Sequence, residues 1–300
     1  MFRNILWSVD PNAPAAPPLA LLRALDGDAD SQLRAMAVLE PFDHLYAAPR
    51  GSLDPKLHQW RRRWHSDLRG KMRVLLRPIA GHGIRLDYKV VDGYPTNVLL
   101  ADLREGERDL LLVRTQTDPQ ARGRIGDLVE ELLLRSPVAL CCVREVAEDY
   151  ALRRILVPTD FSENSASAFE TAVTLAEERG ASVTLLHLMH GWGQKLEPDT
   201  VRRLHATAKK ALKVWRASRP HLVSRRVSIE EEILHAANPA EGILQRAREL
   251  PADLIVVASH GWTGLSGVFF GSTARRVVRG ADVPVLVMRA PVSISIGGSS

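Results

Sequence analysis

Residues 253–273 read DLIVVASHGWTGLSGVFFGST, and this stretch gives the clearest indication of the fold. It begins with a short apolar run typical of a buried strand, continues through a glycine-rich loop, and opens a helix at Ser272. Glycine lets the backbone approach a ligand closely, and the amides at a helix N-terminus favour an anion such as phosphate. The stretch therefore predicts a phosphate-binding loop, although an ordinary turn with Ser272 as the helix N-cap fits the same letters.

The residues around this stretch alternate between strand and helix patterns. We expect strands at 154–158, 182–188, 225–234, 254–259 and 284–289, and helices at 165–179, 198–218, 239–250 and 272–280. Near-continuous apolar strands that alternate with helices indicate a parallel sheet with helices on both faces. In such a sheet, ligands bind at the carboxyl ends of the strands. The glycine-rich loop and the turn after residue 158 both lie at such ends.

The first half of the chain repeats this plan. Three segments recur in the same order: NILWSVD (4–10) and RILVPTD (154–160), DLLLV (109–113) and DLIVV (253–257), and PVALCCVR (137–144) and PVLVMR (284–289). The length of 300 residues also suggests two domains of about 150 residues each. We expect one domain at 1–148 and a second at 149–300, joined at the polar stretch 145–153.

The composition is close to the average for soluble globular proteins, with 45% apolar and 25% charged residues. No apolar run reaches the roughly 18 residues of a membrane-spanning helix, so we expect no membrane contact. The 40 basic and 35 acidic residues are interspersed and give a net charge of only +5, so we expect no nucleic-acid partner. Cys141 and Cys142 are adjacent, which suits no disulfide framework and indicates a reducing cytoplasm.

Several of these segments resemble a universal stress protein domain, and the resemblance covers residues 153–289 nearly end to end. It is carried by ILVPTDFSE (155–163), VTLLHL (183–188), NPAEGIL (238–244), residues 253–272 and PVLVMR (284–289). The family's nucleotide motif is G-x2-G-x9-G-[ST]. Gly261, Gly271 and Ser272 match its last two glycines and its hydroxyl, whereas Ala258 stands at the first glycine. The extra methyl group of Ala258 is expected to weaken a close phosphate contact.

The resemblance implies two tandem Rossmann-like α/β domains, each with a five-stranded parallel sheet in the order 3-2-1-4-5 and helices on both faces. It also implies dimerisation through the last strand, which two halves of one chain can satisfy internally, with a homodimer as a further possibility. The implied ligand is ATP, with Mg²⁺ carried by the nucleotide. The residues implied to hold it are Pro158, Thr159, Asp160, Leu188, Val257, Ala258, Ser259, His260, Gly261, Gly271, Ser272 and Thr273.

The first domain departs from the motif. Asp10 survives at the end of its first strand, but prolines at positions 11, 14, 17 and 18 replace the usual turn into a helix. Thr117 and Asp127 occupy the positions that we align with Gly261 and Gly271. Because an aspartate repels phosphate, we predict that the first domain does not bind ATP.

Other candidate residues have plainer interpretations. Trp60 and Trp64 flank three arginines and could contact nucleic acid, but at helical spacing they are better explained as a packed apolar face. His187 is interpreted as a structural residue. For His260 two interpretations are equally supported: it donates a hydrogen bond to phosphate, or it is a loop residue without a role in binding. Arg275, Arg276 and Arg279 either attract the anionic ligand or form an exposed helix face. No metal-ligand spacing appears.

Three functions remain open on the sequence alone. A binding or signalling module in the stress response fits best, because the loop lacks an evident catalytic base, lysine or metal cluster. A slow ATPase or phosphotransferase is the alternative, with Asp160 orienting a metal or water. An ATP-independent scaffold is the third, with Ala258 marking a lost site. We expect a cytoplasmic protein and name no catalytic residue.

Overall fold

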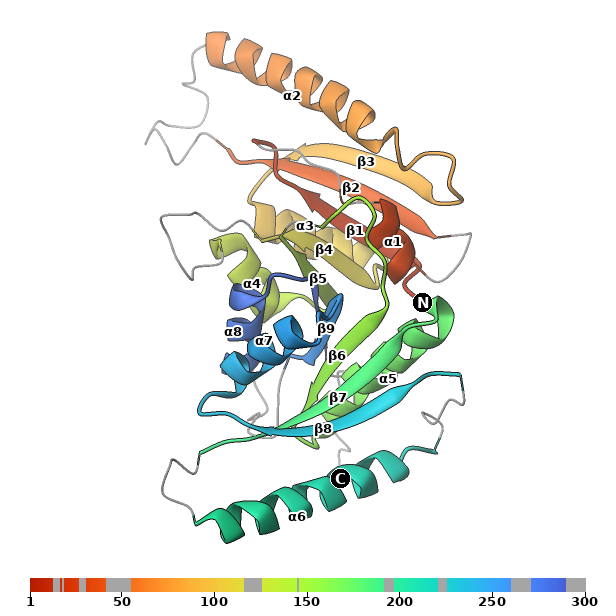
Figure 1. Cartoon of the computed structure of the whole chain (residues 1–300). Coiled ribbons are helices and arrows are strands. Elements are labelled where there is room, and N and C mark those ends of the chain that lie inside the picture. The colour runs from red at the N-terminus through yellow and green to blue at the C-terminus, as the bar shows by residue number, and fades with distance from the viewer. Residues whose placement is uncertain are drawn as a thin grey trace, which may run out of the picture.

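The structure is a computed structural model that describes residues 1–12, 17, 19–26, 31–41, 55–115, 126–144, 146–191, 197–220, 226–259 and 271–289. Strands and helices alternate along the chain (Figure 1). The first half contains β1 (Asn4–Val9), α1 (Leu19–Leu25), β2 (Gln32–Leu39), α2 (Pro55–Leu76), β3 (Arg85–Asp92), α3 (Pro95–Glu105), β4 (Leu110–Arg114), α4 (Asp127–Arg135) and β5 (Ala139–Val143). The second half contains β6 (Arg154–Thr159), α5 (Glu163–Arg179), β7 (Ser182–Met189), α6 (Pro198–Ala217), β8 (Ile229–His235), α7 (Pro239–Glu249), β9 (Leu254–Ala258), α8 (Ser272–Gly280) and β10 (Val285–Met288).

All ten of these strands form one sheet, in the order β3-β2-β1-β4-β5-β10-β9-β6-β7-β8. Within each half the strands are parallel, and each half has its third, second, first, fourth and fifth strand in that spatial order. The halves meet at β5 and β10, which pair antiparallel with Val285 opposite Cys142. The α/β class with parallel strands and helices on both faces is confirmed.

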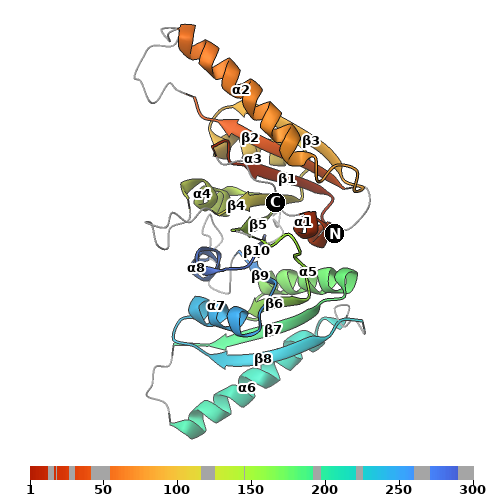
Figure 2. The same cartoon turned by 45° about the horizontal axis from the view of Figure 1, so that its top comes forward.

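The helices form two layers, one on each face of the sheet. Helices α1, α2, α5 and α6 share one hydrophobic cluster, and α3, α4, α7 and α8 share the other. Alternation along a strand divides the side chains: Ile155 and Val157 of β6 face the first cluster, and Leu156 faces the second. Figure 2 shows the sheet between the layers, with α2 and α6 at the two ends of the molecule.

Arginines at the ends of the last strands connect the two halves. Arg144, after β5, donates a hydrogen bond to the carbonyl of Arg279 near the end of α8. Arg289, after β10, donates at 3.1 Å to the carbonyl of Leu132 near the end of α4. Each contact places a cation near the C-terminal end of a helix of the other half, where the helix dipole favours positive charge.

Capping residues explain where several helices begin. Helix α5 starts two residues before the predicted position 165, because the Ser162 side chain accepts a hydrogen bond from the Ser165 amide. The helix ends at Gly180, which has φ 68°, a left-handed conformation that glycine adopts without strain. Helix α1 has only seven residues where α5 has 17, in keeping with the proline-rich sequence before it.

Candidate functional site

A pocket of about 490 Å³ opens at the carboxyl ends of β6, β7 and β9. Its size is within the range of about 300–1,000 Å³ that is typical of small-molecule sites. The first and fourth strands of the second half, β6 and β9, are neighbours here, so the pocket lies at the topological switch point. Its lining residues are Pro158, Thr159, Asp160, Ser165, His187, Leu188, His190, Asn238, Pro239, Ile243, Val257, Ala258, Ser259, Gly271, Ser272, Thr273, Ala274 and Arg276.

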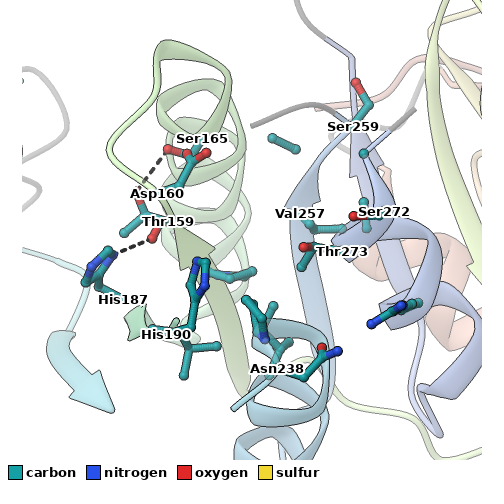
Figure 3. A pocket seen from close by; sticks show the side chains of 18 residues that line it. Thr159, Asp160, Ser165, His187, His190, Asn238, Val257, Ser259, Ser272 and Thr273 are labelled. Atoms are coloured by element: carbon teal, nitrogen blue, oxygen red, sulfur yellow. Dashed lines mark hydrogen bonds between the residues drawn. The ribbon is translucent and has the colours of Figure 1, made fainter. Parts of the chain in front are cut away.

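The structure brings ten of the twelve predicted binding residues into this lining. They are Pro158, Thr159, Asp160, Leu188, Val257, Ala258, Ser259, Gly271, Ser272 and Thr273. His260 and Gly261 lie outside the described residues. Figure 3 shows Ser272 and Thr273 on one side of the pocket, with Thr159, Asp160 and His187 on the other.

The N-terminus of α8 forms one wall of the pocket. Gly271 is its N-cap, with φ −59° and ψ 132°, and its amide donates to the carbonyl of Ser259 at 2.8 Å, which joins the two ends of the loop. No side chain among the described residues caps this helix, and its first turn contains no acid. The first amides of a helix have no acceptor within the helix. This wall is therefore suited to an anion.

The other helices that begin near the pocket have side-chain caps. Ser162 caps α5, and Asn238 caps α7 by accepting from the amides of Ala240 at 2.9 Å and Glu241 at 3.4 Å. Helix α8 has a glycine in the same place and arginines at positions 275 and 276. Cations near a helix N-terminus are unfavourable because the dipole is positive there. Their presence is consistent with a bound anion that offsets the repulsion.

The facing wall is a tight turn after β6, built around Asp160. The Asp160 carboxylate accepts hydrogen bonds from the amide of Ser162 at 3.1 Å and from its hydroxyl at 2.5 Å. Between them, Phe161 has φ 67°, a left-handed conformation that is strained for an aromatic residue. The Phe161 amide donates to the Thr159 hydroxyl at 3.0 Å. Hydrogen bonds on both sides thus hold a strained residue next to the pocket.

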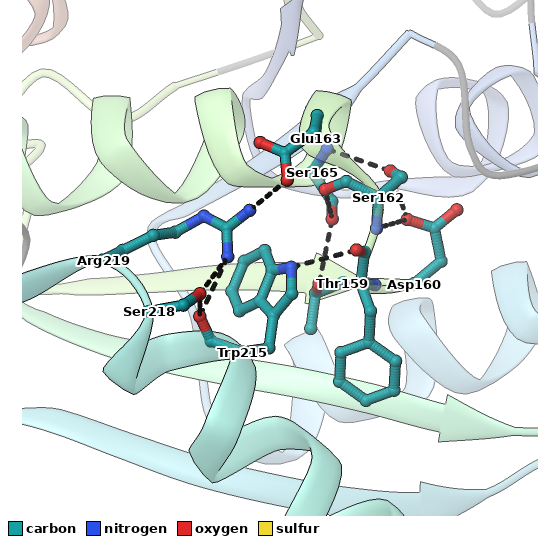
Figure 4. A network of polar contacts seen from close by, with 9 residues as sticks. Thr159, Asp160, Ser162, Glu163, Ser165, Trp215, Ser218 and Arg219 are labelled. Carbon is teal, nitrogen blue, oxygen red and sulfur yellow. Dashed lines mark hydrogen bonds and ion pairs between the residues drawn. The ribbon is translucent and has the colours of Figure 1, made fainter.

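A second network holds the same turn from α6 (Figure 4). The indole N–H of Trp215 donates to the carbonyl of Phe161 at 3.0 Å. The guanidinium of Arg219 lies 4.3 Å from the centre of the Trp215 ring and also pairs with Glu163 at 2.6 Å. The position of α6 and the shape of the pocket are therefore linked through one backbone carbonyl.

His187 supports the turn from β7. Its Nδ1 donates to the carbonyl of Thr159 at 2.9 Å, so Nε2 is the acceptor nitrogen in the neutral ring. The ring stacks on Phe161 with centroids 4.2 Å apart. Burial lowers the pKa of His187 below its usual value, which keeps the imidazole neutral at pH 7. These contacts agree with the structural interpretation of this histidine, which also lines the pocket.

Comparisons with known proteins give the family. The model of the universal stress protein family matches residues 151–289. Universal stress protein YxiE of Bacillus subtilis is 31% identical over 149 residues, covering 45% of this chain and 98% of that protein. A universal stress protein of Thermus aquaticus is 33% identical over 138 residues, covering 46% of this chain and 98% of the relative. The chain belongs to the universal stress protein family.

The likeness in fold extends over both halves. The crystal structure of a universal stress protein from Archaeoglobus fulgidus matches with a TM-score of 0.61 and 16% identity, covering 95% of this chain and 98% of that chain. The family model, by contrast, matches only the second half, where the pocket lies. The first half therefore shares the fold of a universal stress protein while its sequence has diverged further.

The equivalent place in the first half differs in charge, and its alignment needs one correction. Gly126 is the N-cap of α4, with φ −56° and ψ 147°, so it corresponds to Gly271, and Asp127 corresponds to Ser272. The sequence alignment had placed Asp127 against Gly271. Twelve residues (115–126) separate β4 from α4, whereas 13 residues (259–271) separate β9 from α8, which shifts the alignment by one. Thr117 lies outside the described residues.

The structure adds lining residues that the sequence did not indicate and corrects one interpretation. Ser165, His190 and Asn238 line the pocket because the fold brings their elements to its edge, and Arg276, for which the sequence left anion attraction or an exposed helix face open, lines it too. The Asn-Pro pair that opens α7 was the signal for Asn238. The packed face predicted for Trp60 is wrong, since Trp60 is 48% exposed and only the neighbouring Trp64 packs against the core.

Proposed function

We propose that this universal stress protein binds an adenine nucleotide of the ATP type in the pocket of its second half and acts as a binding or signalling module in the stress response. One observation carries the proposal: the N-terminus of α8 enters the pocket without a side-chain cap or an acid in its first turn. An anionic group placed there gains amide hydrogen bonds and a favourable helix dipole. The Asp160 turn faces this end across the pocket.

In this proposal the triphosphate lies at Gly271, Ser272 and Thr273, and the adenosine lies between the Asp160 turn and Leu188. Arg276, which also lines the pocket, supplies positive charge next to the phosphates. Mg²⁺ arrives with the nucleotide. No group of three potential metal-binding side chains occurs in the part of the chain that the structure describes.

The surroundings of Asp160 favour nucleotide binding without turnover. In the alternative function, a slow ATPase or phosphotransferase, Asp160 is the residue that orients the water or the metal. Its Oδ1 already accepts two hydrogen bonds from Ser162 and thereby holds the turn. The scaffold alternative, in which Ala258 marks a lost site, is weakened by Arg275 and Arg276 near the start of α8, because cations at a helix N-terminus are unfavourable unless an anion offsets them.

We also propose that residues 1–148 and 149–300 are two tandem domains of which the second alone binds nucleotide. The acids Asp127 and Glu130 in the first turn of α4 repel a phosphate where α8 has no acid. The β5–β10 pairing provides the contact between last strands within one chain. We place the protein in the cytoplasm, where its two buried thiols stay reduced. For the described residues, no helix is long and apolar enough to cross a membrane.

Isothermal titration of the whole protein with ATP and Mg²⁺ tests the proposal. We expect saturable binding of one equivalent per chain. GTP in the same titration measures how far the Asp160 side of the pocket selects the base. The absence of binding up to millimolar ATP would overturn the proposal and leave the scaffold function. Two equivalents would contradict the assignment to the second domain alone.

A further inference from the structure

Positive charge is concentrated on two helices, α2 and α6. Together they contain 13 lysine and arginine residues and two acids, a net charge of +11. The whole chain has 40 basic and 35 acidic residues. The remainder therefore has 27 basic and 33 acidic residues, a net charge of −6. The charges that are interspersed along the sequence therefore divide into a strongly positive pair of helices and a mildly negative remainder.

The cations of α6 form a stripe on its outer face. The stripe consists of five exposed residues: Arg202, Arg203, Lys209, Lys210 and Lys213. At about 100° per residue they occupy roughly 120° of the helix circumference, and the stripe is about 16 Å long. The buried residues Leu212 and Trp215 lie on the opposite side. Arg202 pairs with Asp199, and the other four side chains form no ion pair with a described residue.

Helix α2 has a similar outer face. Arg62, Arg69 and Arg73 are exposed, lie on one side of the helix, and form no ion pair with a described residue. Like charges four residues apart, as in Arg69 and Arg73 or Lys209 and Lys213, destabilise a helix unless an anion shields them. Two long helices with the same uncompensated charge are therefore better explained by an anionic partner than by solvation alone.

The arrangement of the two helices favours a phosphate polymer over a membrane. Figures 1 and 2 both place α2 and α6 at opposite ends of the molecule, so their outer faces are two separate surfaces. The apolar faces of both helices are packed against the sheet through Leu68 and Met72 and through Leu212 and Trp215. They cannot enter a bilayer as amphipathic helices do. A duplex, with one negative charge per roughly 1.7 Å of its axis, matches an exposed row of cations.

We propose that the outer faces of α2 and α6 are two nucleic-acid contact surfaces that hold the phosphate backbone of a duplex without reading its sequence. This replaces the expectation of no nucleic-acid partner, which rested on interspersed charge. The stripe on α6 and the nucleotide pocket share no residue, and the link between them is the hydrogen bond from Trp215 of α6 to the Phe161 carbonyl.

Fluorescence anisotropy with a labelled duplex DNA of mixed sequence tests the proposal at several salt concentrations. Four phosphate contacts predict that affinity falls about 150-fold between 50 and 200 mM salt. Each of the variants K209A/K210A/K213A and R62A/R69A/R73A is expected to remove one of the two duplex sites, and in the background of R62A/R69A/R73A the three α6 substitutions are expected to reduce the slope of log affinity against log salt by about 2.7. Alanine favours helix, so both variants should stay folded, which circular dichroism verifies.

The matched control is R104A/R135A/R248A, which removes three exposed helical arginines from the other layer of the molecule. This control lowers the net charge by three, as the α6 variant does, and should leave the slope of log affinity against log salt unaltered. If this control weakens binding as much as the α6 variant does, the effect is one of overall charge and the proposal is overturned. Equal binding of phosphatidylserine vesicles, lost in the same two variants, would also overturn it in favour of a membrane.

Discussion

Replacement of Gly271 by aspartate separates the role of α8 in binding from its role in folding. Gly271 is an N-cap with φ −59° and ψ 132°, angles that aspartate also adopts. The new carboxylate would accept hydrogen bonds from the first-turn amides that we assign to phosphate. Loss of two charge-assisted hydrogen bonds of about 1.5 kcal/mol each raises the Kd for ATP by roughly 100-fold. The free energy of unfolding without nucleotide should rise by about 0.5 kcal/mol, because a capped helix with an acid at its start is more stable.

Titration calorimetry with ATP and thermal melting without it measure the two effects. The chain supplies its own control, since Gly126 caps α4 as Gly271 caps α8. Gly126→Asp introduces the same residue at the equivalent position and should leave the Kd unchanged. A Gly271→Asp protein that is at least as stable as wild type and still binds ATP normally would refute the placement of the phosphates at α8.

Three further changes test the walls of the pocket. Ala258→Gly removes the methyl group at the first motif position and should tighten ATP binding about fivefold, the equivalent of about 1 kcal/mol of relieved crowding, as measured by calorimetry. Trp215→Phe removes the hydrogen bond to the Phe161 carbonyl and should weaken ATP binding about fivefold, since about 1 kcal/mol no longer holds the strained turn, whereas Trp64→Phe on α2 should not affect it. His187 has a lowered pKa, so the unfolded chain takes up a proton below about pH 6.5 that the folded chain does not. The free energy of unfolding should therefore fall as pH drops below about 6.5, and His187→Gln should flatten this dependence in urea titrations.

Each of these has an outcome that contradicts it. Unchanged or weaker binding by Ala258→Gly would show that the methyl group does not limit the site. A Trp215→Phe protein with a lower melting temperature but an unchanged Kd would show that the turn keeps its shape without α6. If the pH dependence of stability is the same with and without His187, its burial does not control that dependence.

The sequence predicted those parts of the site that are indicated by the residues next to them in the chain. The turn at Asp160 follows an apolar strand directly, the helix opening at Ser272 follows one after 13 residues (259–271), and parallel strands bring their carboxyl ends together. The alignment of the two segments was wrong by one residue. The sequence pattern locates the strand before each segment and the helix after it, but the number of residues between strand and helix differs between the two halves. Gly126 became recognisable as the counterpart of Gly271 only when both were seen to cap helices.

The remaining features depend on packing between distant segments. Nothing local to Trp215 indicates that its N–H reaches the carbonyl of Phe161, 54 residues away. Helical spacing placed Trp60 and Trp64 on one face of a helix, and their ring centroids are 4.9 Å apart. The same spacing could not show that Trp60 is 48% exposed, since that depends on how the helix packs against the sheet.

The antiparallel pairing of β5 with β10 joins two halves that no longer have to be alike. In an assembly of two identical chains, every substitution appears at both copies of a position, so an acid that harms one ligand site harms its twin. Here Asp127 and Ser272 stand at equivalent helix starts within one polypeptide, and each position can change alone. Covalent linkage thus frees one half to exchange a binding loop for other uses while its partner strand still completes the sheet.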